Sequence, residues 1–241
     1  MAKLSKMGKR GRKEPIVRVF LSYSNKDKGI AGNLKRYLEY YGVSAFLAHE
    51  DIEGGEEWAR EIFSALDSSQ VLIVILTVRA KKSSYVSQEI GYAIARNTVI
   101  LPFKVGINPF GFAARIQALK PTLTYDIQTQ EKVIDFESSA EKIARKISQI
   151  DELSASFRKR LVTSFATSGS YKETRCKLKF LRYYDDLTDE DKVTILKAAL
   201  DNDQVYREDM MRSFLYKLIT AEPNLLNKTD TKLVLTNISA R

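Results

Sequence analysis

A carboxylate and an aromatic ring stand four residues apart in the segment 83–96, where Tyr85 precedes Glu89. On a helix this spacing places the two side chains within reach of each other. The segment follows an apolar run at 71–76, and Ser83 or Ser84 can cap its N-terminus through the side-chain oxygen. A carboxylate just beyond the C-terminal end of a strand lies where open α/β sheets form their sites. Glu89 is therefore the first candidate for chemistry in this chain.

A second face of the same predicted helix is apolar. Its members recur at helical spacing and predict a buried face: Val86, Ile90, Ala93 and Ile94. Glu89 and Tyr85 lie on a neighbouring face that we expect to be open to solvent. Without further information a glutamate in such a place is a solvated or ion-paired side chain, and a tyrosine is half-buried.

Composition narrows the chemistry further. The chain has 241 residues, of which 44% are apolar and 29% charged, as in globular proteins. Cys176 is the only cysteine and His49 the only histidine, so we expect no disulfide, no metal site and no histidine-based triad. No apolar run approaches the roughly 20 residues of a membrane span. The N-terminus lacks the apolar core of a signal peptide, and we expect a cytoplasmic protein.

The formal net charge of +9 is concentrated at one end. Residues 1–14 carry six basic side chains and one acidic side chain, so more than half of the excess lies there. This segment has no helical periodicity, and we predict a disordered basic tail. We expect this tail to make only weak, salt-sensitive contacts with nucleic acid, because the remaining chain is nearly balanced in charge.

Residues 15–150 alternate short apolar runs with amphipathic stretches, which predicts βαβ units and a parallel sheet. Five strands are expected, at 16–22, 43–47, 71–76, 99–103 and 123–127. Pro102 would fit best near the end of the fourth strand, because it lacks a backbone donor. Gly42 suits the C-terminal cap of the first helix. The predicted fold class is α/β, with a flavodoxin-like five-stranded parallel sheet.

Beyond residue 150 the strand signal ends. Residues 151–241 carry apolar stripes at helical spacing, and Thr188 begins an acidic N-terminal cap. We predict a small all-α domain whose stripes pack on each other, on the α/β domain or on another chain. Nothing in this region indicates a particular chemistry.

Four motifs occur in a characteristic order: 19–27 (Val-Phe-Leu-Ser-Tyr-Ser-x-x-Asp), 51–55 (Asp-Ile-Glu-Gly-Gly), 85–93 around Glu89, and 99–103 (Val-Ile-Leu-Pro-Phe). Together they resemble the Toll/interleukin receptor (TIR) domain, in particular its bacterial and archaeal branch. The resemblance extends from residue 16 to about residue 150.

The resemblance implies two kinds of activity. Some TIR domains are adaptors, and others cleave the nicotinamide–ribose bond of NAD⁺ to give ADP-ribose or a cyclic isomer. In the cleaving members a glutamate ends a Trp-x-x-x-Glu motif, and Tyr85 and Glu89 occupy these positions here. The resemblance thus implies Glu89 as the catalytic residue and Tyr23, Ser24, Trp58 and Tyr85 as residues that contact NAD⁺, which is substrate rather than cofactor. It also implies a setting in prokaryotic antiphage defence.

Two alternatives remain open at this point. A non-enzymatic TIR scaffold is favoured by the tyrosine in place of tryptophan. A nucleoside deoxyribosyltransferase would also cleave an N-glycosidic bond through a glutamate. For the enzyme, we expect self-association through the loop 51–57 and through the helical domain.

Overall fold

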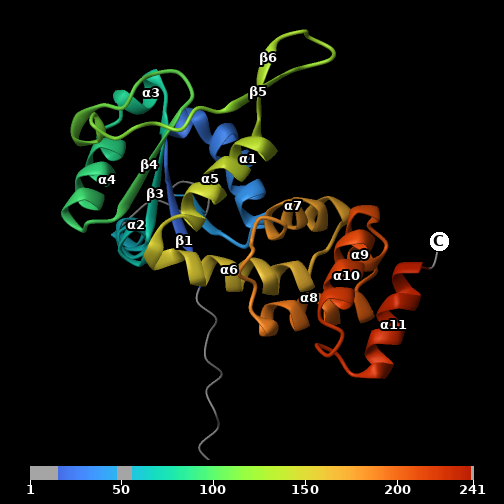
Figure 1. Cartoon of the computed structure of the whole chain (residues 1–241). Coiled ribbons are helices and arrows are strands. Elements are labelled where there is room, and N and C mark those ends of the chain that lie inside the picture. The colour runs from blue at the N-terminus through green and yellow to red at the C-terminus, as the bar shows by residue number, and fades with distance from the viewer. Residues whose placement is uncertain (1–15, 48–55, 240–241) are drawn as a thin grey trace, which may run out of the picture.

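The computed structural model describes residues 16–47 and 56–239, with the side chains of residues 56–59 excepted. Four parallel strands form the central sheet: β1 (Arg18–Ser22), β2 (Ser44–Leu47), β3 (Val71–Leu76) and β4 (Val99–Lys104). Their order is β2-β1-β3-β4. Figure 1 labels β1, β3 and β4 of this sheet. The chain therefore leaves β1 in one direction and continues from β3 in the other, as in doubly wound α/β folds.

Helices cover both faces of this sheet. They are α1 (Lys28–Tyr40), α2 (Glu56–Ser68), α3 (Val78–Lys81), α4 (Ser84–Ala95) and α5 (Phe136–Ser148), with short 3-10 turns at η1 (Asn25–Asp27) and η2 (Gly111–Ala113). Alternate residues of β1 and β3 enter two separate cores. Val19 and Leu21 join the core that includes α1 and α5, whereas Phe20 joins the core that includes α2 and α4. All six residues of β3 are buried, which explains its uninterrupted apolar sequence.

The prediction of a fifth parallel strand was wrong. The segment 123–127 belongs instead to an antiparallel hairpin of β5 (Thr122–Tyr125) and β6 (Lys132–Asp135). Beside β4, where the fifth strand was expected, the chain makes one isolated parallel bridge between Phe103 and Leu119. Leu119 donates to the carbonyl of Pro102 and accepts from the N–H of Lys104, both at 2.8 Å.

Two prolines explain why this edge gains only one bridge. In a parallel ladder the next bond on one side would come from the N–H of residue 121, and on the other side from the N–H of residue 102. Both residues are prolines and have no N–H to donate. We had expected Pro102 near the end of its strand, but it lies within β4. Because β4 is the edge strand, the missing donor breaks no bond to β3.

The hairpin extends away from the rest of the molecule (Figure 1). Its turn is formed by Asp126, whose carboxylate accepts from the backbone N–H groups of Gln128 and Thr129 at 2.9 and 2.8 Å. Gln130 completes the turn with a φ of 57°. This local turn brings β6 back beside β5 and explains why the segment did not join the sheet.

The region after residue 150 is helical, as predicted. It contains α6 (Asp151–Ala166), α7 (Tyr171–Leu181), α8 (Asp189–Asp201), α9 (Asp203–Tyr206), α10 (Asp209–Ala221) and α11 (Lys228–Ser239). Thr188 caps α8 as expected, in a reciprocal capping box with Asp191. The apolar stripes of these helices pack on one another and on the α1/α5 face of the sheet, in one continuous core that includes Leu34, Ile143, Leu161 and Ile238.

Specific contacts join the helical region to α1 and α5. The rings of Tyr41 and Phe180 lie 5.5 Å apart. Lys172 donates to the hydroxyl of Tyr37 and pairs with Glu137, both at 3.2 Å. Arg145 stacks over Tyr183 at 4.0 Å. The α1–β2 turn and α5 therefore bury apolar surface against the helices that follow.

Gly42 lies at the tightest point of this interface. Its φ is 75°, and a Cβ there would come within 3.0 Å of Arg160 Cγ and 3.2 Å of the Arg160 carbonyl on α6. We expect Gly42→Ala to lower the free energy of unfolding by roughly 2 kcal/mol, from backbone strain and displacement of α6. Gly91→Ala is the control, because nothing lies within 4 Å of that position in α4. Urea denaturation should show no loss for Gly91→Ala, and an equal loss in both variants would contradict the proposed close packing.

Candidate active site

Glu89 is buried and hydrogen-bonded at the C-terminal edge of the sheet. Ser83 caps α4 by accepting from the N–H of Val86, and Glu89 follows in the second turn of the helix. Only 5% of Glu89 is exposed, although we had expected an open face. Ser22, the last residue of β1, donates its hydroxyl to Glu89 Oε2 at 2.5 Å. A helix and a strand thus hold the carboxyl group in one orientation.

Burial raises the pKa of the Glu89 carboxyl from 4.5 to about 7, and the hydrogen bond from Ser22 offsets part of that rise. Desolvation disfavours the charged form, whereas a hydroxyl donor favours it. The group is thus poised to change its ionisation near neutral pH, a property that buried carboxyls at active sites often have.

The raised pKa has a consequence for stability. Because the folded state holds this proton more tightly than the unfolded state, the contribution of Glu89 to stability is fully present below pH 4.5 and is lost as the pH rises through about 7. Glu89→Gln keeps the shape and the bond from Ser22 without the charge. We expect it to stabilise the protein at pH 8 by up to about 3 kcal/mol, the equivalent of the pKa shift, and to have little effect at pH 5.

Denaturation at both pH values would measure this difference. Glu61→Gln, at an exposed position on α2, is the matched control and should change stability at neither pH. A stabilisation by Glu89→Gln that is equal at pH 5 and pH 8 would show that the ionisation of Glu89 is not its cause.

A second buried carboxylate lies at the same edge of the sheet. Asp27, which is 4% exposed, ends the η1 turn after β1. It accepts from Thr77 Oγ1 at 2.6 Å and pairs with Arg79 at 3.0 Å. Thr77 also caps α3 by accepting from the N–H of Ala80. These bonds fix the segments that leave β1 and β3 and leave most of the Arg79 side chain exposed.

The position of these groups follows from the strand order. Ser22 pairs with Val74 in adjacent parallel strands, so the segments after β1 and β3 leave the sheet at one edge. The sheet order changes direction between β1 and β3, and ligands of open α/β sheets bind outside the strand ends at such points. The arrangement therefore provides a carboxyl of raised pKa at the position where this class of fold binds its ligands.

The predicted site residues do not all lie together. Tyr85 begins the turn before Glu89 and is 51% exposed. Ser24 is half-buried just after β1, where its carbonyl accepts from the N–H of Asp27 at 2.6 Å. Tyr23 is 2% exposed and points into the other core, with α1 and α5. Trp58 belongs to α2, but its side chain lies outside the described residues, as do the loop at 51–55, His49 and the basic tail.

Ser22 is the contact that our sequence analysis missed. Side chains alternate along β1, so Val19, Leu21 and Tyr23 share one face while Phe20 and Ser22 share the other. The helix α4 covers the second face. Counting this alternation would have placed Ser22, rather than Tyr23, next to Glu89.

Three further features concern metal binding, the cysteine thiol and membrane insertion. Among the described residues, no group of three or more acidic, histidine or cysteine side chains could hold a metal ion. Cys176 is 1% exposed, and burial raises the pKa of its thiol to about 12, so it is not poised as a nucleophile. In the part of the chain that the structure describes, every helix is too short or too polar to cross a membrane.

Comparison with known proteins identifies the class to which this fold and site belong. Residues 19–150 match the model of the TIR domain family, and the chain belongs to that family. This membership favours the TIR assignment over a nucleoside deoxyribosyltransferase. A search of curated proteins found no match.

Two solved structures are similar over parts of the chain. The TIR domain of the Toll-related receptor TRR-2 from Hydra magnipapillata is 21% identical and covers 42% of this chain and 82% of its own, with a TM-score of 0.38. The TIR domains of the activated Roq1 resistosome, which recognises the effector XopQ, are 16% identical. They cover 69% of this chain and 98% of their own, with a TM-score of 0.34.

Proposed function

We propose that this protein cleaves the nicotinamide–ribose bond of NAD⁺ and that Glu89 is its catalytic carboxylate. The observation that carries the proposal is the buried Glu89 carboxyl, held by Ser22 at the β1/β3 edge of a TIR fold. Prokaryotic antiphage defence is the setting we propose, from the resemblance of the sequence motifs alone.

The reaction requires little from the protein beyond electrostatic stabilisation. When the glycosidic C–N bond breaks, its electron pair leaves with nicotinamide, which departs as a neutral molecule without a general acid. The ribose C1′ becomes an oxocarbenium-like cation, and a nearby carboxylate stabilises that charge or binds the ribose hydroxyls. Water then adds its oxygen to C1′ and loses a proton, giving ADP-ribose. Attack by an atom of the adenine or ribose instead would give a cyclic product.

We propose that two further side chains near Glu89, those of Tyr85 and Ser24, contact NAD⁺. Tyr85 presents an exposed ring one turn away on α4, where it can stack on a flat ligand. Ser24 lies at the same sheet edge. Tyr23 instead supports the strand from the opposite core, and Trp58 remains a prediction.

A non-enzymatic TIR scaffold is the second candidate. The observation that favours it is Tyr85, a smaller ring than the tryptophan of the cleaving members. Incubation of the purified full chain with NAD⁺, at low and high protein concentration, decides between the two. Chromatographic detection of nicotinamide and ADP-ribose or its cyclic isomer supports the enzyme. No nicotinamide at either concentration would overturn the proposal.

Self-association is proposed from the family, because TIR domains assemble into oligomers. The helical region offers less support than its sequence indicated, because its apolar stripes already pack within the chain. If assembly activates the enzyme, activity per molecule should rise with protein concentration.

The Ser22–Glu89 bond predicts a shift in pH dependence. Ser22→Ala removes a donor that lowers the pKa of Glu89, so ionisation should require a higher pH than in the wild type. We expect the rising limb of the kcat–pH profile to move upward by up to about one unit, with the rate recovering at alkaline pH. Ser87→Ala, on an exposed position of the same helix, should leave the profile unchanged. A uniform loss of rate at every pH would instead indicate a structural role for Ser22.

A further inference from the structure

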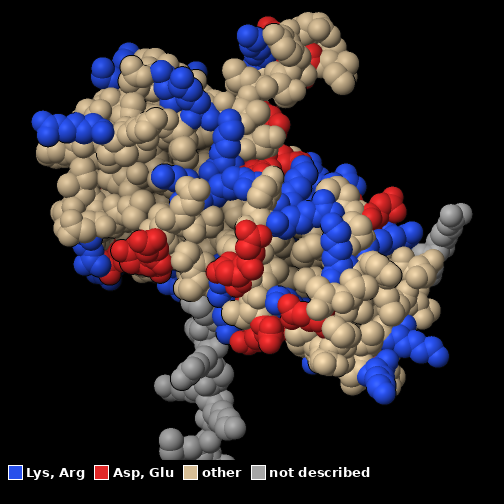
Figure 2. All heavy atoms as spheres, in the orientation of Figure 1, with Lys and Arg blue, Asp and Glu red and all other residues tan. Residues whose placement is uncertain are grey.

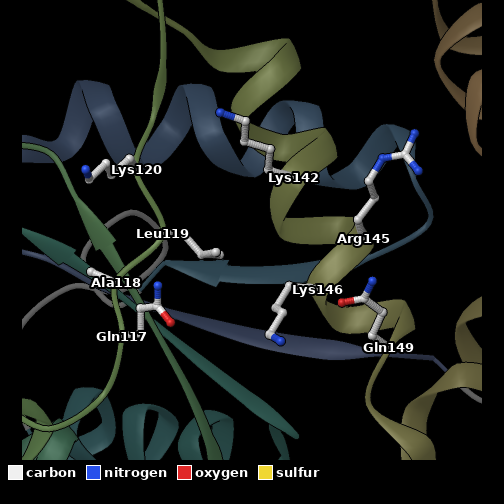
Figure 3. Close-up of a pocket in the computed structure, with 8 residues that line it drawn as sticks. All are labelled: Gln117, Ala118, Leu119, Lys120, Lys142, Arg145, Lys146 and Gln149. Carbon is white, nitrogen blue, oxygen red and sulfur yellow. The ribbon is translucent and has the colours of Figure 1, made fainter.

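A basic cavity lies between α5 and the segment that bridges to β4, away from Glu89. Its volume is about 510 Å³, within the range of small-molecule sites. Four of its eight lining residues are cationic, two are amides, two are apolar and none is acidic: Lys120, Lys142, Arg145, Lys146, Gln117, Gln149, Ala118 and Leu119. Figure 3 shows α5 on one side of this space and the segment 117–120 on the other.

Among the residues that the structure describes, the lysines of this cavity have no ion-pair partner, unlike the cations around them. Arg145 pairs with Glu141 at 2.7 Å, and its guanidinium turns away from the segment 117–120 (Figure 3). Lys172 and Lys179 both pair with Glu137, at 3.2 and 3.7 Å. Within the described ranges, Lys120, Lys142 and Lys146 take part in no ion pair. Figure 2 shows basic side chains gathered over α5 and α7 on this face of the molecule.

The walls of the cavity are fixed by bonds already described. Leu119 makes both of its backbone hydrogen bonds to β4, which hold the segment 117–120 against the sheet edge. On the other side, Ile143 and Ile147 bury the inner face of α5 and set the direction of Lys142 and Lys146. The cationic groups thus project from two anchored elements, which lowers the entropy lost when a ligand binds.

We infer that this cavity binds a small molecule that carries two or more phosphate groups. Lysine ammonium groups bind phosphate as point charges. Three lysines on two sides of the cavity suit a ligand with several negative charges better than a ligand with a single charge. Gln117 and Gln149 offer donors and acceptors at the rim. The cavity is open to solvent on one side, and its limited volume favours a small ligand over a nucleic-acid backbone, which follows an extended groove or ridge of charge. The inference does not depend on NAD⁺ cleavage.

Calorimetric titration of the full chain with inorganic tripolyphosphate tests this site. We expect saturable binding that weakens at least about tenfold in the Lys142→Gln/Lys146→Gln double variant, because both charges line the cavity. Lys228→Gln/Lys232→Gln is the matched control: these lysines have the same spacing on α11, are exposed and lie outside the cavity. The control should bind within about twofold of the wild type.

A third variant separates the site from general charge. Gln149→Glu places a carboxylate at the rim, and we expect at least about tenfold weaker binding without loss of melting temperature. Equal weakening in both lysine pairs, or binding that does not saturate, would overturn the inference. So would tighter binding of a short DNA duplex than of tripolyphosphate through Lys142 and Lys146, because the site would then serve nucleic acid.

Discussion

Glu89→Gln is expected to reduce nicotinamide release from NAD⁺ by at least about a hundredfold, the usual scale for loss of an electrostatic stabiliser. The amide keeps the volume of the side chain and can accept the hydrogen bond from Ser22, so the fold is retained. What is lost is the negative charge that would stabilise an oxocarbenium ion. The measurement is single-turnover and steady-state production of nicotinamide at pH 8, where the wild-type carboxyl is ionised.

Two comparisons make this result specific. Glu61→Gln, at an exposed position on α2, should retain wild-type turnover. The Glu89→Gln protein should melt at or above the wild-type temperature at pH 8, because the cost of burying a charge has been removed. Turnover near that of the wild type in a folded Glu89→Gln protein would show that another group performs the reaction.

The local sequence predicted a strand of the sheet correctly where the strand is a continuous apolar run. The run at 71–76 became β3 with the predicted bounds, because all six residues face a core. The prediction of a parallel strand at 123–127 was wrong. This segment pairs with β6 because of the turn at Asp126, and Pro102 and Pro121 lack the N–H donors that pairing with β4 would need. Pairing between distant segments depends on such backbone donors, which an apolar pattern does not reveal.

The sequence predicted Glu89 as the candidate catalytic residue but did not predict its environment. The order of the motifs indicated Glu89, and the amphipathic pattern of α4 placed it on an open face, whereas the structure buries it against Ser22. Tyr23 was chosen because it stands in the motif, although the alternation of β1 turns it toward α1 and α5. Faces of strands can be counted from the sequence, but a buried polar contact between β1 and α4 needs the tertiary structure.

The helical region should be required for the fold of the TIR domain in this chain. Removal of residues 151–241 would expose Tyr41 and the apolar face of α5, which now pack against α6 and α7. Each large apolar side chain returned to water costs about 1.5–3 kcal/mol. A few such losses equal the roughly 5–15 kcal/mol by which a domain is stable. We therefore expect the fragment 1–150 to melt at least about 10 °C below the full chain, or to aggregate.

Removal of residues 1–13 is the matched terminal truncation. The sequence of this basic segment predicts no buried contact, so the melting temperature should stay within about 2 °C of the full chain. Circular dichroism of the three proteins, at one protein concentration and two salt concentrations, would compare them. If the fragment 1–150 melted cooperatively within a few degrees of the full chain, the shared core would be dispensable. The helical region would then be an independent module, free to serve assembly instead of supporting the TIR fold.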